Sequence, residues 1–353
     1  MNPSNEAATI VVPGDLHLTT REQENYSAAV RVVEEINELV RPDFVQFIGD
    51  NVQDVTEEQF DLFDEIRRLV KAPHFSLVGD HDVVGDSQAT LFRKRVGQPA
   101  GSTVLSGYRF VRLNTLDPPR LGFSDAQLCW LEDEFETARY SGERVVLFQH
   151  HYPHKVCESF AGPGVERWRA LVNDYRPVAT VCGHTHYLQF ANDGRNVSVA
   201  TRSIGDPEGG PAGYLVLHLQ DDDFAAAYRT IEDSGPLVLI THPRALLLAT
   251  AGRHVVSGDD EFRARIWSPV RPSRVVGSID GGAWFDLLAT VDGGWSAPLD
   301  GSRLEKGEHR VVVEARLPDG GRGRNDIRFF FDPTGRFTAV PDAQPVVRTT
   351  AFC

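Results

Sequence analysis

The sequence predicts an α/β domain followed by a smaller all-β domain. The first two thirds of the 353 residues alternate short β-branched runs with amphipathic helical patterns. After Ser234-Gly235-Pro236 the pattern changes to short period-two runs separated by turns. The length also exceeds that of a typical single domain. We therefore expect an α/β domain over 1–235, an immunoglobulin-like β-sandwich over 236–335 and an irregular tail over 336–353.

The α/β part begins with a strand at 8–12 and a helix near 21–40, where Thr20 and Gln23 are spaced as a capping box. A strand at 44–48 follows, and Thr56 and Gln59 open the next helix. Alternation of this kind favours crossover connections and a largely parallel sheet. Further strands are expected at 74–78, 109–113, 145–149 and 178–182, helices near 87–96, 124–138 and 165–174, and successive strands from about 187 to 231.

The C-terminal part contains about seven candidate strands and no convincing helix. Turns such as Asp280-Gly281-Gly282 and Asp292-Gly293-Gly294 are typical of hairpins. This pattern predicts a β-sandwich of immunoglobulin size. We expect it to be structural or to form homo-oligomers. The strand candidates include 262–267, 274–279, 284–289, 309–316 and 326–331.

Composition narrows the range of partners. The net charge is −14 and the Lys and Arg residues are scattered, which argues against a nucleic-acid polymer as partner. The N-terminus lacks a signal-peptide pattern, and no window is apolar enough to span a membrane. The four cysteines form no CxxC pair, so neither a zinc knuckle nor a disulfide framework is predicted. We expect a cytoplasmic protein without a membrane partner, whose positive charge for an anionic substrate comes from bound metal ions.

Five predicted strands are followed directly by residues with metal-binding side chains. The carboxyl ends of strands in an open α/β sheet share one edge, where ligands bind. Each short motif alone is more often a turn, but five in succession favour a metal site. A glycine before the acidic residue or histidine lets the chain turn sharply off the strand. The residues are Asp15 and His17, then Asp50 and Asn51, then Asp80, His81 and Asp82, then His150 and His151, and finally His184 and His186.

This order of motifs resembles that of the calcineurin-like metallophosphoesterases, which carry D-x-H, GD, GNH with an acidic residue, H, and GHxH. The resemblance covers roughly 8–220 and is closest to the bacterial cyclic-nucleotide phosphodiesterase branch. It implies two sheets flanked by helices, and two metal ions that share Asp50. Mixed imidazole and carboxylate donors suit Mn, Fe or Zn. The implied ligands are Asp15, His17, Asp50 and His186 for one ion, and Asp50, Asp80, His150 and His184 for the other.

The family pattern leaves two positions open. Asp80 stands where the family usually has asparagine, and its added negative charge should tighten metal binding and weaken attraction for phosphate. The alternative is that Asp80 is a neutral drift position. The His150-His151-Tyr152-Pro153 run resembles the family's HHPP form, which favours His150 over His151 as the ligand.

The expected activity is metal-dependent hydrolysis of a cyclic nucleotide or a small organic phosphodiester. Two metal ions lower the pKa of a bridging water, so that a hydroxide attacks phosphorus. His81 would contact the phosphoryl oxygen or protonate the leaving group, with Asp82 orienting its ring. Asn51 is either a hydrogen-bond donor to the phosphate or a turn residue. The alternatives are hydrolysis of phosphomonoesters or pyrophosphate and, less favoured, a non-catalytic metal-binding scaffold.

Overall fold

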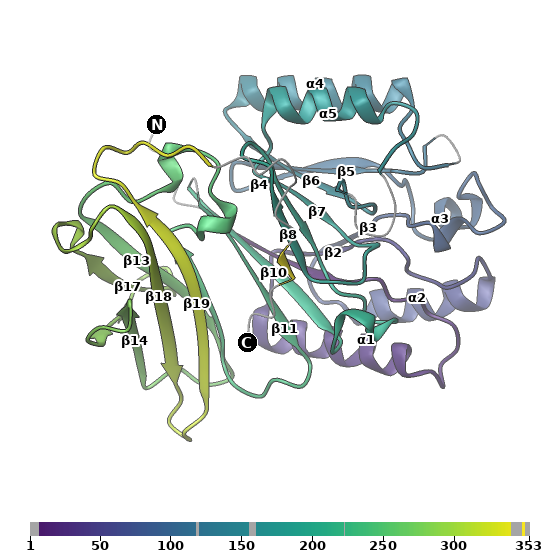
Figure 1. Ribbon diagram of the computed structural model, residues 1–353. Coiled ribbons are helices and arrows are strands. Elements are labelled where there is room, and N and C mark those ends of the chain that lie inside the picture. Colours follow the sequence, from purple (N-terminus) through teal and green to yellow (C-terminus); the bar gives the residue numbers. More distant parts are fainter. Residues whose placement is uncertain (1–6, 118–119, 155–159, 222, 340–347, 350–353) are drawn as a thin grey trace.

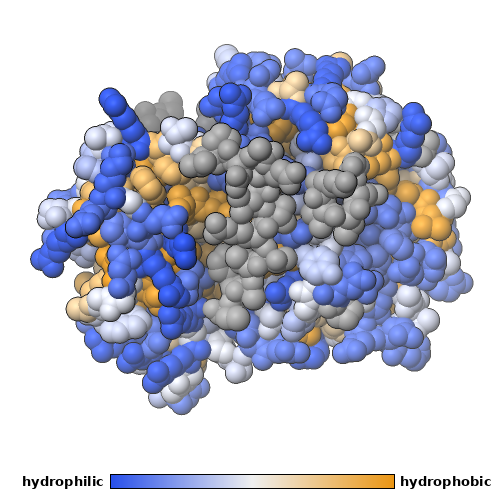
Figure 2. Space-filling view, viewed as in Figure 1, coloured by the Kyte–Doolittle hydropathy of each residue, from blue (hydrophilic) through white to orange (hydrophobic). Residues whose placement is uncertain are grey.

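The computed structural model describes residues 7–117, 120–154, 160–221, 223–339 and 348–349. Two sheets packed face to face form the body that carries the motifs, and a third and a fourth sheet lie beside it (Figure 1). Hydrophilic residues cover most of the face shown in Figure 2, and apolar colour is visible over the C-terminal sheets. Among the residues that the structure describes, no helix has the length and apolar character needed to span a membrane.

The first sheet has five strands in the order β11-β10-β1-β2-β3. Strands β1, β2 and β3 are parallel, while β10 and β11 run antiparallel to their neighbours. Alternation along β1 buries Val11 under the flanking helices and Ile10 and Val12 between the two sheets. The elements are β1 (Ala8–Pro13), β2 (Phe44–Phe47), β3 (His74–Ser76), β10 (Gly213–Gln220) and β11 (Asp223–Thr230), with helices α1 (Glu24–Glu35), α2 (Glu57–Leu69) and α3 (Thr90–Arg95).

The second sheet has seven strands in the order β20-β8-β9-β7-β6-β5-β4, and β5, β6, β7 and β9 are parallel. Helices α4 and α5 cover its outer face (Figure 1), where Leu113 and Leu147 pack against Leu128 and Trp168. The expected two-sheet sandwich flanked by helices is confirmed. The elements are β4 (Gly101–Leu105), β5 (Tyr108–Leu113), α4 (Asp125–Ser141), β6 (Arg144–Gln149), α5 (Val165–Tyr175), β7 (Ala179–Cys182), β8 (Gln189–Asn192), β9 (Val197–Ala200) and β20 (Arg348–Thr349).

The C-terminal part forms two antiparallel four-stranded sheets, β12-β13-β17-β16 and β15-β14-β18-β19. Phe262, Val311 and Phe329 lie in the core between them, as expected of a β-sandwich. The domain boundary after residue 235 stays a prediction. The strands are β12 (Leu237–His242), β13 (Asp260–Trp267), β14 (Arg274–Ile279), β15 (Phe285–Asp286), β16 (Leu288–Ala289), β17 (Trp295–Leu299), β18 (Gly307–Arg316) and β19 (Arg322–Phe331).

Strand β12 connects the two parts because both of its faces are buried. Leu237 and Leu239 pack into the core beneath α1 and α2. Val238 and Ile240 point the other way, into the core of the C-terminal sandwich. At the end of the strand, His242 pairs with Asp223 of β11 at 2.7 Å.

The helix starts differ in part from expectation. Thr56 caps α2 as predicted, because its side chain accepts a hydrogen bond from the Gln59 backbone N–H. The capping box at Thr20 and Gln23 is wrong: the Gln23 N–H bonds to the Thr20 carbonyl, and α1 begins only at Glu24 without a side-chain cap. A turn replaces the expected first turn of that helix.

Candidate metal centre

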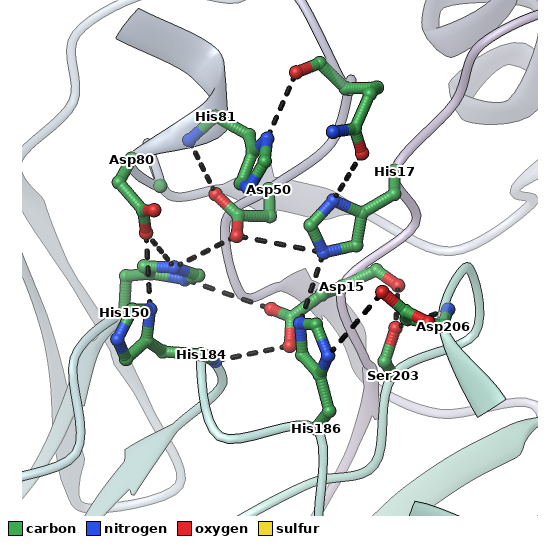
Figure 3. A network of polar contacts seen from close by, with 12 residues as sticks. Asp15, His17, Asp50, Asp80, His81, His150, His184, His186, Ser203 and Asp206 are labelled. Carbon is green, nitrogen blue, oxygen red and sulfur yellow. Dashed lines mark hydrogen bonds and ion pairs between the residues drawn. The ribbon is translucent and has the colours of Figure 1, made fainter. Parts of the chain in front are cut away.

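The polar residues that follow β1, β2, β3, β6 and β7 lie together at one edge of the two facing sheets (Figure 3). Two groups of potential ligand atoms are compact, with all atoms of each group within 4.8 Å of one another. Asp50 belongs to both groups. The first consists of Asp50, Asp80, His150 and His184, and the second of His17, Asp50 and His81.

In the first group, one carboxylate oxygen lies between two imidazole rings. Asp80 Oδ1 is 3.0 Å from His150 Nε2 and 3.1 Å from His184 Nδ1. His150 Nε2 is also 3.3 Å from Asp50 Oδ2. Four donor atoms from four different loops therefore converge on one small volume, which suits a transition-metal ion with mixed nitrogen and oxygen ligands.

Around the second group, two imidazole nitrogens face each other: His17 Nε2 and His186 Nε2 are 3.1 Å apart. His17 Nε2 is also 3.7 Å from Asp50 Oδ2. Asp15 is fully buried, and its Oδ1 accepts no hydrogen bond from any described residue. A buried carboxylate oxygen without a donor is costly. A cation held by Asp15, His17, Asp50 and His186 would satisfy it, so the donor set fits a metal ion.

The backbone at these residues is strained. His17, Asp50, His184 and His186 have φ values of 45°, 49°, 66° and 61°, in the left-handed region that residues with a Cβ rarely adopt. Part of the compensation comes from backbone hydrogen bonds, since the N–H groups of Leu16 and His17 both donate to the Asp50 carbonyl at 2.9 Å. Backbone strain of this kind concentrates at functional sites, where the surrounding structure holds it.

Glycine is required beside the ligands because the loops pack closely. Gly49 has a φ of +105°, and a Cβ there would lie 2.4 Å from His150 Nδ1. At Gly183, a Cβ would lie 2.4 Å from Asp15 Oδ1. The sequence interpretation explained these glycines by sharp turns, but the second reason is the space that the neighbouring ligand side chains occupy.

Of the two adjacent histidines, His150 is the one inside the donor cluster. Its Nδ1 lies 2.9 Å from the Ile48 carbonyl, which leaves Nε2 turned toward Asp50 and Asp80. His151 Nδ1 instead lies 2.7 Å from the Thr115 hydroxyl, and its Nε2 is 3.8 Å from Asp80. The geometry thus favours His150 as the ligand, in line with the HHPP form.

His81 belongs to the second group, and no described hydrogen bond links it to Asp82. The His81 Nδ1 lies 2.9 Å from the Gln53 carbonyl, and its ring centroid is 4.6 Å from that of His17. Asp82 is buried and accepts hydrogen bonds from the backbone N–H groups of Asn51 and Gly79 at 3.0 and 2.8 Å. These loop contacts occupy the Asp82 carboxylate, so the expected orienting role of Asp82 has no support among the described hydrogen bonds.

The side chain of Asn51 makes its hydrogen bonds within the protein. Its side chain is fully buried and donates from Nδ2 to the Leu77 carbonyl at 2.9 Å and to Asp82 at 2.8 Å. Those bonds use both N–H groups of the amide. The geometry supports the turn-residue interpretation over a hydrogen bond to phosphate.

The ionisation of the first group is dominated by its close contacts. Burial disfavours the charged form of Asp80, but hydrogen bonds from His150 and His184 outweigh burial and lower its pKa. Burial likewise opposes protonation of His150, yet attraction to Asp50 raises its pKa well above the ordinary value. Because a metal-bound imidazole must be neutral at the ligating nitrogen, this shift makes protons compete with metal for His150.

The pKa of Asp82 is shifted in the opposite direction to that of Asp80. Burial raises the pKa of Asp82 to about 7, and repulsion from Asp50 adds to the effect against the backbone hydrogen bonds that it accepts.

Sequence reasoning missed two features of the site. Gln53 Oε1 lies 3.0 Å from His17 Nδ1, so this amide holds the ring of a predicted ligand, although glutamine carries no metal-site signal. Asp206 and Glu208 each lie 3.9 Å from His186 Nδ1. Their only sequence signal is two acidic residues in a glycine-rich loop before a strand.

Two helix-flanked sheets that carry a carboxylate and imidazole cluster at their strand ends define a metal-dependent phosphoester hydrolase. The chain matches the family described as calcineurin-like phosphoesterase over residues 8–188, and it belongs to this family. The resemblance to the cyclic-nucleotide branch stays a prediction.

Relatives include both monoester and diester hydrolases by name. Human tartrate-resistant acid phosphatase type 5 is 26% identical over 309 residues, which cover 74% of this chain and 89% of that protein. The probable glycerophosphodiester phosphodiesterase GpdQ of Arcobacter nitrofigilis is 27% identical over 197 residues, 50% of this chain and 71% of the relative.

Two solved structures share the fold. A dimetal phosphatase from Danio rerio superposes with a TM-score of 0.53 at 15% identity, covering 64% of this chain and 96% of that one. Purple acid phosphatase PPD1 from yellow lupin seeds superposes with a TM-score of 0.52 at 15% identity, covering 65% and 52%.

Proposed function

We propose that this phosphoesterase binds two metal ions and hydrolyses small organic phosphodiesters. The observation that supports it best is the position of Asp50, whose carboxylate belongs to both donor groups and can therefore lie between two ions. The ions, when bound, would supply positive charge to the phosphoryl oxygens and an activated water. Mn, Fe and Zn match the mixed donors. The proposed ligands are Asp15, His17, Asp50 and His186 for one ion and Asp50, Asp80, His150 and His184 for the other.

The charge around the site favours diesters over monoesters. Asp80 adds a carboxylate to the donor cluster, and Asp206 and Glu208 stand at its rim beside His186. A monoester carries close to two negative charges near neutral pH, whereas a diester carries one. Repulsion from these carboxylates therefore disfavours the monoester more strongly. The competing candidate, monoester hydrolysis, is favoured by similarity to an acid phosphatase over 74% of the chain.

The test compares bis-p-nitrophenyl phosphate with p-nitrophenyl phosphate on protein stripped with chelator and reloaded with Mn, Fe or Zn. We expect metal to restore diester hydrolysis at a rate at least about tenfold above that of the monoester. Asp50→Ala, which removes the carboxylate common to both groups, should lose at least one ion and the activity. A faster monoester reaction would select the competing candidate, and inactivity with two ions bound would favour the scaffold.

His81 is the proposed proton donor to the leaving group. Its Nδ1 is engaged with the Gln53 carbonyl, so Nε2 is the nitrogen that can carry a proton toward substrate. Burial opposes protonation of His81, but the nearby Asp50 carboxylate raises its pKa, which favours the proton-carrying form. No described hydrogen bond links His81 to Asp82, so the proposal no longer includes an orienting carboxylate.

His81→Ala should therefore lower kcat by about a hundredfold, the range of general acid catalysis, while both ions stay bound. The loss should be larger for an alkyl diester than for a p-nitrophenyl diester, because p-nitrophenolate leaves without protonation. Metal content by mass spectrometry separates loss of the acid from loss of a ligand. Equal losses on both substrates would contradict the acid role.

A further inference from the structure

A cavity of about 290 Å³ lies at the starts of strands β6 and β7, whereas the metal centre lies where these strands end. It is bounded by the C-terminal ends of α4 and α5, by the turn between β8 and β9, and by residues 244–254 that lead into the C-terminal sandwich. Strand β6 connects the two places, with Arg144 at the cavity and His150 just beyond its other end. Six residues of strand separate them by about 20 Å.

The cavity is lined by many positively charged residues, although the protein as a whole is negatively charged. Six of the seventeen described lining residues are arginines, although the chain has a net charge of −14 and only 36 Lys and Arg residues in 353. The one acidic residue among these seventeen, Glu143, is already paired with Arg109 at 2.8 Å. Like charges gathered in one concavity repel one another unless a counter-ion lies between them. The arginines are Arg139, Arg144, Arg176, Arg195, Arg244 and Arg253.

Ordinary structural roles account for only part of this set. Arg139 lies in the last turn of α4 and Arg176 caps α5, positions where a cation complements the helix dipole. Arg144 lies over the Tyr108 ring at 5.0 Å. By contrast, Arg195 and Arg253 are exposed on a turn and a short 3₁₀ segment, and neither forms an ion pair with any described residue.

The most buried of these arginines contacts a histidine of the cavity lining. Arg244 is only 4% exposed, and its Nη1 donates to His254 Nδ1 at 3.2 Å. That His254 nitrogen also accepts the Thr250 backbone N–H at 3.0 Å, so it is the unprotonated nitrogen of the ring. His254 thus contacts this guanidinium at the cavity wall.

We propose that this cavity is a binding site for a small polyphosphate anion, of the size of pyrophosphate. One guanidinium group can donate two parallel N–H hydrogen bonds to phosphate oxygens. Several arginines therefore suit an anion that has several such oxygens. The anion would contact Arg195 of the catalytic body and Arg253 of the connecting segment, and so would tie the C-terminal sandwich to the enzyme. Because the site is distant from the metal centre, the proposal does not depend on the proposed function.

Calorimetric titration with inorganic pyrophosphate tests the site on full-length protein in buffer free of phosphate and sulfate. Arg195→Gln with Arg253→Gln should weaken binding at least tenfold and leave diester hydrolysis unchanged. Arg41→Gln with Arg68→Gln removes the same charge from exposed positions outside the cavity lining and should leave binding intact. Asp50→Asn impairs the metal centre instead and should also retain binding.

The three variants make the outcome decisive. Binding that Asp50→Asn abolishes and the cavity variant retains would place pyrophosphate at the metal centre and overturn the proposal. Absence of binding to the wild-type protein would overturn it as well. Circular dichroism of each variant confirms that lost binding does not reflect lost folding.

Discussion

Gln53 holds two imidazole rings at the metal centre, although it carries no charge. Its side-chain oxygen faces His17 Nδ1 and its carbonyl faces His81 Nδ1. Groups that fix the ring of a metal-bound histidine commonly contribute 10–100-fold to metal affinity. Gln53→Leu should therefore weaken metal binding by about tenfold or more, measured by competition with a chromogenic chelator.

Gln53→Glu is the matched control, because a carboxylate can still accept the hydrogen bond of His17. It should bind metal at least as well as the wild type. Equal affinities for the leucine and glutamate variants would show that ring orientation at His17 does not limit binding.

Asp80 is the position where a single atom changes the electrostatics of the site. Its Oδ1 contacts both His150 and His184. Asp80→Asn keeps an oxygen for a metal but removes a negative charge, so we expect several-fold weaker metal affinity and a higher relative rate on monoesters. Metal titration and the ratio of kcat/KM values for the two p-nitrophenyl substrates measure these effects. If neither changes, Asp80 is a neutral drift position.

Candidate ligands could be proposed from the sequence because each follows a strand, and strand ends are visible in local patterns, while their assignment to two ions came from the family resemblance. Asp15, His17 and Asp50 lie together in the structure (Figure 3), and their role as ligands stays a prediction. The contacts of Asp82 and Asn51 could not be predicted in the same way, since they link the loop after β2 to the loop and strand end at β3. Such contacts depend on how β2 and β3 pair, which short motifs do not encode.

At the level of elements, Asp82 joins the loops after β2 and β3. The backbone N–H groups of Asn51, Val52 and Gly79 all donate to its carboxylate, and the side chain is buried. Asp82→Ala would take the acceptor from these three backbone groups and from the Asn51 side-chain amide, which also donates to Asp82. We expect the free energy of unfolding to fall by at least about 3 kcal/mol.

Urea denaturation of metal-free protein measures this loss, with His81→Ala as the neighbouring control. His81 is partly exposed and should cost far less stability. A small loss for Asp82→Ala would mean that water replaces the carboxylate between the loops.

The order of helices and strands was predictable for the same local reason, whereas the order of strands within each sheet was not. Strand β10 lies beside β1 although 199 residues separate Pro13 from Gly213. The long-range pairing of β20 with β8 likewise had no sequence signal. Amphipathic periodicity predicts that a segment is buried but does not say against which neighbour.

At the level of the whole molecule, His242 links the first sheet to the C-terminal sandwich. It pairs with Asp223 at 2.7 Å and with Asp260 at 3.1 Å. Burial opposes protonation of His242, but the hydrogen bonds that its ring donates to the two carboxylates outweigh burial and raise its pKa to about 9. The protonated form is therefore stabilised by folding, by at most about 3 kcal/mol.

Because the folded pKa exceeds the unfolded one, this contribution is complete below about pH 6.5 and is lost as pH rises through about 9. His242→Gln should remove that pH dependence, measured as the difference in unfolding free energy from wild type across this range. His309→Gln, at a pair with the more exposed Asp280, is the control and should have a smaller effect. A constant difference for His242→Gln would contradict the assignment.

Strand β12 contributes side chains to two hydrophobic cores. Leu237 and Leu239 lie in one core, and Val238 and Ile240 lie in the other. Neither core is complete without β12. Heat or denaturant that opens one side exposes the other to water, so the catalytic body and the sandwich should lose their structure together in a single cooperative transition. Because β12 belongs to both cores, neither part can be exchanged for a foreign domain by cutting the chain at Gly235 alone.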